Sequence, residues 1–263
     1  MNRGAVLIFA RRPELGQVKT RLATCIGKKT AFALYRAFLQ DTLLSARESG
    51  ATILLAHTPG GHFPEQELAD ITIEQRGSSF GQRFDAAFAD ARGRLPDEMP
   101  LVLIGADTPH LPPRSLRNAL DSLGEFKAVI GPSSNGGFYL LGFSATPVPI
   151  AEAFAHSSDR ETTEVVQLLN QAGVRPKLLD FWFDVDLPED LVKLVAFLDL
   201  LETVAAEWIP QHTRDLLLEI RNRLPNVHNE SRQSLWRFRK GFGEELGESS
   251  YGLNSRMRDE VAW

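Results

Sequence analysis

The sequence predicts an α/β fold built on a doubly wound, mostly parallel sheet. Short runs of branched apolar residues, such as Leu101–Ile104, are typical of strands that are buried on both faces. Segments with apolar residues at helical spacing, such as Lys28–Glu48, alternate with these runs. Alternation of strands and amphipathic helices favours parallel pairing, because each helix carries the chain back across one face of the sheet.

Each expected element has a local signature in the sequence. Strands are expected at Ala5–Phe9, Thr52–His57, Ile71–Gln75, Leu101–Ile104, Lys127–Gly131, Phe138–Phe143 and Lys177–Asp186. Helices are expected at Lys28–Glu48, around Phe84–Ala91, from Pro113, at Glu161–Ala172, from Pro188 and at Gln211–Leu224. Gly50 suits the end of the first helix, and Pro188 suits the first turn of a later one.

Length and composition indicate one sizeable core with an appendage. The 263 residues are expected to form a domain over residues 1–208 and an extension over residues 209–263, a helix plus an irregular tail. The net charge of −5 disfavours nucleic-acid binding. The single cysteine, Cys25, excludes an internal disulfide and fits a reducing compartment. No apolar run reaches the roughly eighteen residues of a membrane span, so we expect a cytoplasmic protein without membrane contact. The oligomeric state stays open.

A basic loop follows the first expected strand. It contains Arg11, Gly16, Lys19 and Arg21. Gly16 permits close approach of the backbone, and Lys19 and Arg21 emerge where a phosphate group could bind. The loop lacks the Gly-Lys-Ser/Thr ending of a P-loop, and it lacks a dinucleotide-binding fingerprint. Taken alone, a solvent-exposed basic loop is the simpler interpretation.

A carboxylate follows the buried strand Leu101–Ile104, in the sequence LVLIGADTPHL. Ligands of open α/β sheets bind outside the carboxyl ends of the strands, which makes Asp107 a candidate binding residue. On its own, Asp107 equally suits a helix cap or a turn before Pro109.

A second pair of carboxylates, Asp184 and Asp186, falls in the last expected strand. Residues i and i+2 of a strand point to the same face. Two carboxylates about 4 Å apart repel by roughly 4 kcal/mol at an effective dielectric constant of about 20, so the pair needs a proton or a cation. Carboxylate and water ligands suit Mg²⁺ or Mn²⁺. Asp186 is also explained as a cap for the helix from Pro188, whereas Asp184, among aromatic neighbours, is not.

Four motifs in order resemble the nucleotide-diphospho-sugar transferase superfamily. They are FARRPELGQVKTRLA (Phe9–Ala23), IGADTPHL (Ile104–Leu111), GPSSNGGFYLLGF (Gly131–Phe143) and DVDLPEDL (Asp184–Leu191). The similarity is to the glycosyltransferase-A-like branch related to the 2-phospho-lactate guanylyltransferases and the molybdenum-cofactor guanylyltransferases. It implies a three-layer αβα sandwich with a mostly parallel mixed sheet, which binds a nucleotide and a divalent cation.

The resemblance also implies roles for individual residues. Catalysis falls to Lys19, Arg21 and Asp107. Nucleotide binding falls to Arg11, Gly16, Lys19, Arg21, Gly81 and Arg83. Contact with the acceptor or sugar falls to Asn135, Gly136 and Gly137. Asp107, Asp184 and Asp186 would bind the metal, Mg²⁺ or Mn²⁺.

The implied activity is a metal-dependent transfer that uses a nucleotide, and three possibilities stay open. Nucleotidyl transfer from a nucleoside triphosphate to a small phosphorylated acceptor is slightly favoured, because Lys19 and Arg21 would match the high charge of a triphosphate. The alternatives are glycosyl transfer from a nucleotide-sugar and a non-catalytic regulatory module that binds a nucleotide. Asn135 bears on the last possibility, because it stands where the family usually has aspartate and therefore lacks the charge.

Overall fold

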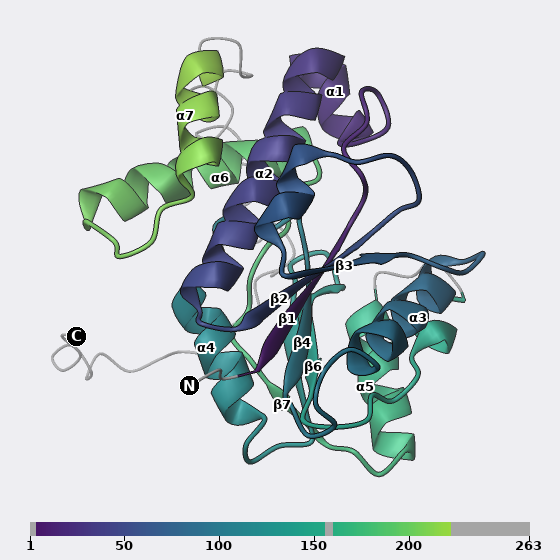
Figure 1. Ribbon diagram of the computed structural model, residues 1–263. Helices are drawn as coiled ribbons and strands as arrows, with labels where there is room; N and C mark the ends of the chain where they lie inside the picture. Colours follow the sequence, from purple (N-terminus) through teal and green to yellow (C-terminus); the bar gives the residue numbers. More distant parts are fainter. Residues whose placement is uncertain (1–3, 156–159, 222–263) are drawn as a thin grey trace, which may run out of the picture. The chain divides into compact units, whose positions relative to one another are not determined.

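The computed structural model describes residues 4–155 and 160–221, which contain a seven-stranded mixed sheet (Figure 1). The strands are β1 (Ala5–Ala10), β2 (Thr52–His57), β3 (Ile71–Glu74), β4 (Leu101–Gly105), β5 (Ala128–Pro132), β6 (Phe138–Phe143) and β7 (Pro176–Leu178). Their order is β3-β2-β1-β4-β6-β5-β7, and among these strands β6 alone runs antiparallel to its neighbours. The mostly parallel sheet predicted from the sequence is confirmed.

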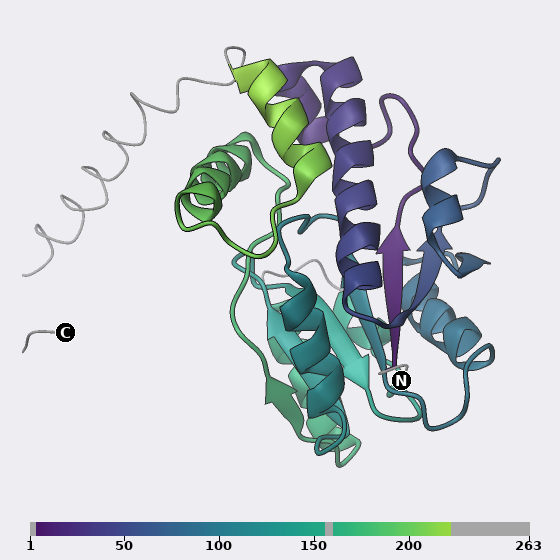
Figure 2. The same ribbon diagram turned by 60° about the vertical axis from the view of Figure 1, so that its left-hand side comes forward.

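Helices cover both faces of the sheet, which makes the fold a three-layer αβα sandwich (Figure 1 and Figure 2). One face is covered by α2 (Lys28–Glu48) and α4 (Pro113–Ser122). The opposite face is covered by α3 (Phe80–Arg92) and α5 (Glu161–Gln171), with the short 3₁₀ helix η2 (Ala151–Phe154) beside α3. A second 3₁₀ helix, η1 (Pro64–Leu68), lies between β2 and β3.

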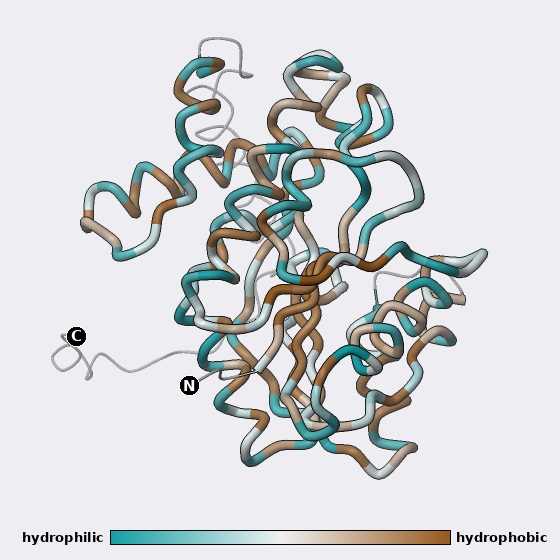
Figure 3. The backbone as a smooth tube through the Cα atoms, in the orientation of Figure 1, coloured by the Kyte–Doolittle hydropathy of each residue, from teal (hydrophilic) through white to brown (hydrophobic). Residues whose placement is uncertain are grey.

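The alternation of side chains along the central strands divides the core in two. Val6 and Ile8 of β1 pack in the cluster that includes α2 and α4. Ala5 and Leu7 of the same strand pack in the cluster that includes α3 and α5. All four side chains are fully buried, as expected for a central strand with helices on both sides. The central strands are accordingly the most continuously hydrophobic part of the chain (Figure 3).

A third apolar cluster joins α2 to α1 (Thr20–Ile26), α6 (Pro188–Thr203) and α7 (Gln211–Ile220). The buried carboxylate of Asp41 on α2 accepts hydrogen bonds from the backbone N–H groups of His212 (3.2 Å) and Thr213 (2.7 Å). These donors belong to the first turn of α7, where a negative charge is favourable. Asp41 therefore attaches α7 to α2. Among the residues that the structure describes, none of the helices combines the length and the apolar character that a membrane span requires.

The described residues all belong to one unit of the chain, residues 1–224. Helix α7 falls in the part that we expect to be an extension, and residues 222–263 lie outside the described residues. The expected boundary at residues 208/209 stays a prediction.

The predicted strand Lys177–Asp186 is wrong over most of its length. The strand ends at Leu178, and Trp182 makes only an isolated parallel bridge with Ser133. The following residues turn across the carboxyl ends of the strands, where the Val185 N–H donates to the Asp107 carbonyl oxygen (2.9 Å). Residues 176–186 therefore pair with β5, with Ser133 and with Asp107 in turn. A local pattern of apolar residues does not indicate such a change of hydrogen-bonding partner.

A short helix, α1, replaces part of the loop that we expect after β1. It begins at Thr20, so that Arg21 lies on a helix rather than on a loop. Within α1, only Leu22 is fully buried. Seven residues with one buried side chain carry too weak a periodicity to predict a helix from the sequence.

Candidate active site

The candidate site lies at the point where the order of the strands reverses. From β1 the chain first adds β2 and β3 on one side, and then β4 on the other side of β1. In open α/β sheets this switch point leaves a crevice at the carboxyl ends of the two central strands. Lys19 follows β1 and Asp107 follows β4, so the topology brings them to the same crevice.

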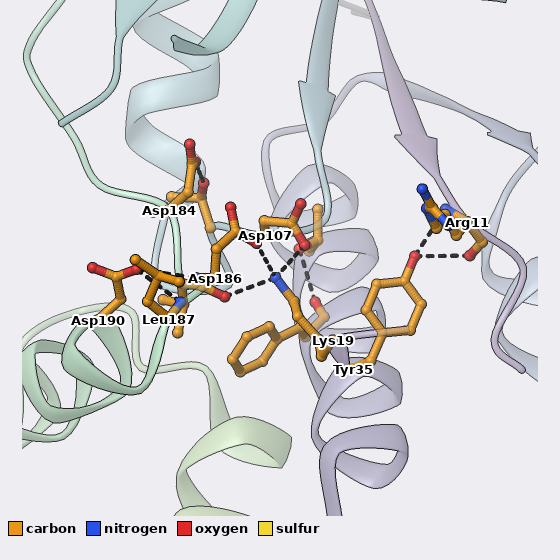
Figure 4. A network of polar contacts seen from close by, with 12 residues as sticks. Arg11, Lys19, Tyr35, Asp107, Asp184, Asp186, Leu187 and Asp190 are labelled. Atoms are coloured by element: carbon orange, nitrogen blue, oxygen red, sulfur yellow. Dashed lines mark hydrogen bonds and ion pairs between the residues drawn. The ribbon is translucent and has the colours of Figure 1, made fainter. Parts of the chain in front are cut away.

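The ammonium group of Lys19 is the centre of the site (Figure 4). Its Nζ lies 2.5 Å from Asp107 Oδ1, 3.0 Å from Asp186 Oδ1 and 2.7 Å from the carbonyl oxygen of Val185. Burial alone would lower the pKa of Lys19, but the charges of Asp107 and Asp186 outweigh burial and raise it above its usual value. Lys19 is therefore a permanent cation between two carboxylates.

The segment that carries Asp186 is held by the start of α6. Asp190, in the first turn of that helix, accepts hydrogen bonds from the backbone N–H groups of Asp186 (3.2 Å) and Leu187 (3.0 Å) (Figure 4). Asp190 therefore has the capping role that the sequence suggests for Asp186. Asp186 is left with its side chain directed at Lys19.

Asp184 points to a different set of partners. Its Oδ1 accepts a hydrogen bond from Thr108 Oγ1 (2.7 Å), and its Oδ2 accepts from Ser133 Oγ (2.8 Å) and Asn135 Nδ2 (3.3 Å). Burial raises the pKa of Asp184 and the charges of Asp107 and Asp186 add to this rise, while the hydrogen bonds from Thr108 and Ser133 oppose it. Asp184 thus ties together the segments that follow β4 and β5.

Asn135 occupies the turn between β5 and β6 that the Asn-Gly pair predicts. Its side-chain oxygen accepts a hydrogen bond from the Gly137 N–H (3.0 Å), and Gly136 has φ +83°, a conformation that favours glycine. The carbonyl oxygen of Gly137 accepts a hydrogen bond from Thr162 Oγ1 (2.5 Å). These three residues therefore form one turn beside Asp184, whereas their predicted contact with an acceptor or sugar stays a prediction.

The variant Asn135→Asp is expected to lower the free energy of unfolding at pH 7 by about 1 kcal/mol. The new carboxylate would replace the amide that donates to Asp184, so that two negative charges face each other. Both folded-state pKa values would then rise, and the loss of stability would be present above them and disappear as the pH falls through them. Urea unfolding at pH 7 and pH 4 measures the difference. Asn118→Asp, on the exposed side of α4, is the matched control, and equal losses in both variants at both pH values would contradict the expectation.

None of the remaining residues assigned to nucleotide binding forms a hydrogen bond or ion pair with the side chain of Lys19. Arg11 and Arg21 are exposed, and Gly16 turns the intervening loop at φ +82°. The backbone of Arg11 is anchored to α2, because Tyr35 Oη accepts from its N–H (2.9 Å) and donates to its carbonyl (2.7 Å) (Figure 4). Burial, followed by the charge of Asp107, raises the pKa of Tyr35, which stays neutral.

Gly81 and Arg83 lie in the first turn of α3. A Cβ atom at Gly81 would come within 2.6 Å of the Ala151 carbonyl oxygen, so glycine is required there for close packing of α3 against η2. Arg83 is partly buried, and its Nε has no hydrogen-bond partner among the described residues. The predicted contacts of both residues with a nucleotide stay predictions.

Three supporting residues escape prediction from the sequence: Thr108, Ser133 and Tyr35. Thr108 directly follows Asp107, and Ser133 lies two residues before Asn135, so proximity to candidate residues was a usable signal for both. Tyr35 has no such signal, because it lies inside an amphipathic helix at a position that periodicity assigns to the core.

The donor set fits a hard divalent cation with two protein ligands. Asp107 and Asp186 both contact the ammonium of Lys19, and their side chains are 43% and 37% exposed. Mg²⁺ commonly binds through one or two carboxylates together with substrate phosphates and water. Both oxygens of Asp184 accept hydrogen bonds, from Thr108 and Ser133, and its predicted role as a metal ligand stays a prediction. In the described part of the chain, no group of three or more His, Cys, Asp or Glu side chains is placed to hold a metal.

Comparison with known proteins finds a matching family model and similar solved structures. The model of a family described as "Uncharacterized protein conserved in bacteria (DUF2064)" matches residues 42–158, and no curated protein matches the sequence. Among solved structures, the chain is similar to a protein from Desulfovibrio desulfuricans G20 that is provisionally assigned as a nucleotide-diphospho-sugar transferase. The two chains are 28% identical, with 85% of this chain and 97% of that chain covered and a TM-score of 0.73.

Other solved structures are more distant. They include a cytidylyltransferase from Leptospira borgpetersenii serovar Hardjo-bovis (15% identity, 86% and 98% covered, TM-score 0.48). They also include 2-C-methyl-D-erythritol 4-phosphate cytidylyltransferase from Thermus thermophilus (18% identity, 68% and 89% covered, TM-score 0.42). The fold is that of the nucleotide-diphospho-sugar transferases, a class of transferase enzymes, as the four sequence motifs predict.

Proposed function

We propose that this protein is a transferase that acts on a nucleotide substrate and transfers a nucleotidyl group from a nucleoside triphosphate to a small phosphorylated acceptor. The observation that carries the proposal is the convergence of Asp107 and Asp186 beside Lys19 at the switch point of the sheet. The similarity to the Desulfovibrio protein supports the use of a nucleotide.

The reaction that we propose is a displacement at phosphorus. An oxygen of the acceptor phosphate attacks the α-phosphorus, the bond between that phosphorus and the oxygen bridging to the β-phosphate breaks, and pyrophosphate leaves. Positioning and neutralisation of charge account for most of the catalysis in such reactions. A divalent cation, when bound, supplies Lewis-acid chemistry and neutralises charge on the phosphate oxygens.

The protein's own residues would divide this task. Asp107 and Asp186 would hold the cation, since their side chains lie beside each other on Lys19 and are partly exposed. Asp184 would act as a positioning residue, through Thr108 and Ser133. The exposed cations Arg11 and Arg21 would be free to meet the phosphates.

A ligand panel tests the proposal. Thermal shifts measured with nucleoside triphosphates, nucleoside diphosphates and nucleotide-sugars, each with and without Mg²⁺ or Mn²⁺, identify the nucleotide. A ligand at 100 times its dissociation constant stabilises the folded state by about 2.7 kcal/mol. We expect a metal-dependent shift with one triphosphate, followed by pyrophosphate release when phosphorylated acceptors are added. If no acceptor in a broad panel releases pyrophosphate, the proposal is wrong, and binding without turnover would indicate a regulatory module.

Glycosyl transfer is the second candidate, and the assignment of the Desulfovibrio protein favours it. In that reaction the same carboxylates would hold a cation on the diphosphate leaving group. The panel separates the two reactions, because glycosyl transfer requires tighter binding of a nucleotide-sugar than of the corresponding triphosphate.

A further inference from the structure

The ammonium group of Lys19 has no free hydrogen-bonding capacity. Its three N–H donors match three oxygens, one each from Asp107, Asp186 and the backbone carbonyl of Val185. The ring of Phe38, which is fully buried, lies beneath, with its centroid 5.5 Å from Nζ. Lys19 is therefore enclosed by its partners in the free protein, and its predicted contact with phosphate stays a prediction.

Exposure distinguishes the two sides of this ion cluster. The Lys19 side chain is 4% exposed, whereas the carboxylates of Asp107 and Asp186 are 43% and 37% exposed. The Lys19 ammonium thus lies on the protein side of the carboxylates, and a ligand from solvent would meet the carboxylates first. An approaching divalent cation would share these carboxylates with Lys19.

The backbone of Lys19 indicates that this placement is built into the site. Lys19 has φ +46° and ψ +43°, and among the described residues that are not glycine only Ala205 also has a positive φ. This left-handed conformation is unfavourable for a side chain with a Cβ atom, and such residues persist where surrounding contacts fix them. Here those contacts are the ion pairs and the carbonyl of Val185.

We propose that Lys19 is a resident counter-cation, which keeps Asp107 and Asp186 in place and prevents the free protein from binding a divalent cation tightly. The inference rests on the proposed function, since it concerns the same carboxylates. The ammonium of Lys19 offsets one of the two negative charges of Asp107 and Asp186, which weakens their attraction for Mg²⁺ or Mn²⁺. The phosphates of a nucleotide supply the missing negative charge. The cation is therefore retained only together with the nucleotide.

Replacing Lys19 with methionine tests this inference without any measurement of turnover. Mn²⁺ binding is followed by electron paramagnetic resonance in the absence of nucleotide. Lys19→Met is expected to bind Mn²⁺ at least about tenfold more tightly than the wild type, because the competing charge is removed while both carboxylates remain. Lys19→Arg keeps the charge and is expected to bind Mn²⁺ as weakly as the wild type. Lys29→Met, at an exposed position of α2, is the matched control and is expected to change nothing.

The outcomes are distinct for the inference and for the proposed function. If Lys19→Met binds Mn²⁺ no more tightly than the wild type, the inference is overturned. If Lys19→Met is unfolded without metal, we expect Mn²⁺ to restore its folding, as measured by circular dichroism. Failure of Mn²⁺ to restore folding would also overturn the inference. Wild-type protein titrated with Mn²⁺ and each triphosphate tests the function separately. Metal-dependent nucleotide binding there, combined with no gain in Lys19→Met, would leave the function standing and remove the inference.

Discussion

Turnover is expected to fall about 10²- to 10³-fold when Asp107 is replaced by asparagine. Asparagine has nearly the same shape but no charge, so that a cation at the site would lose one of two carboxylates. Lys19 would keep Asp186 and the carbonyl of Val185 as partners, which should preserve the fold. The kcat of pyrophosphate release, measured with the triphosphate that the ligand panel selects, gives the effect.

Two measurements make this prediction specific to the site. Asp97→Asn, at an exposed position outside the site, should leave kcat unchanged. In the absence of metal, Asp107→Asn should bind the triphosphate as tightly as the wild type does, because the substitution weakens only the binding of the divalent cation. A variant with wild-type kcat would exclude Asp107 from the reaction.

The second large effect concerns His110, which is buried in an aromatic environment. Its ring lies 4.2 Å from the ring of Phe183, 5.4 Å from that of Phe197 and 5.5 Å from that of Trp182, measured between centroids. Neither ring nitrogen has a hydrogen-bond partner among the described residues. Burial lowers the pKa of His110 to about 3, so the folded protein keeps this imidazole neutral.

The free energy of unfolding is therefore expected to fall on acidification. In the unfolded chain His110 takes up a proton below about pH 6.5, whereas in the folded protein it does not until about pH 3. The unfolded state binds more protons in this window, so stability declines as the pH falls through it. Between pH 7.5 and pH 4.5 the contribution of His110 amounts to about 2 to 3 kcal/mol.

The variant His110→Phe isolates this contribution. Urea unfolding gives the free energy of unfolding at pH 7.5 and at pH 4.5. The loss of this free energy between the two pH values should be about 2 to 3 kcal/mol smaller in His110→Phe than in the wild type. Because the pKa of Asp184 is raised in the folded protein, its protonation increases the free energy of unfolding as the pH falls. Asp184 is present in both proteins, so this effect cancels in the comparison. His62→Phe, at an exposed position, should retain the wild-type difference. An unchanged pH dependence in His110→Phe would show that the imidazole titrates normally.

Most of the fold follows from local patterns in the sequence. The bounds Thr52–His57, Phe138–Phe143 and Lys28–Glu48 agree between expectation and structure. These elements have a continuous apolar run or a sustained helical period, and their side chains form the core on the faces that the pattern indicates. Helix α1 and the end of β7 lack such a pattern, and both were predicted incorrectly.

The candidate site was predictable as a set of residues but not as a geometry. The sequence indicates that Asp184 and Asp186 share a face because they are two residues apart in a strand. In the structure they lie beyond β7 and face different partners, Thr108 and Ser133 for Asp184 and Lys19 for Asp186. The predicted need for a cation holds for Asp186, and Lys19 meets it.

By itself, the sequence determined the fold class, the position of Asp107 after a central strand and the resemblance to a class of transferase. These properties depend on residues that are close together along the chain. Tertiary structure alone decided the pairing of Lys19 with Asp107 and Asp186, because these residues are 88 and 167 positions apart. Such pairing depends on the order of the strands and on the hydrogen bond from Val185 to Asp107, and neither leaves a local signal.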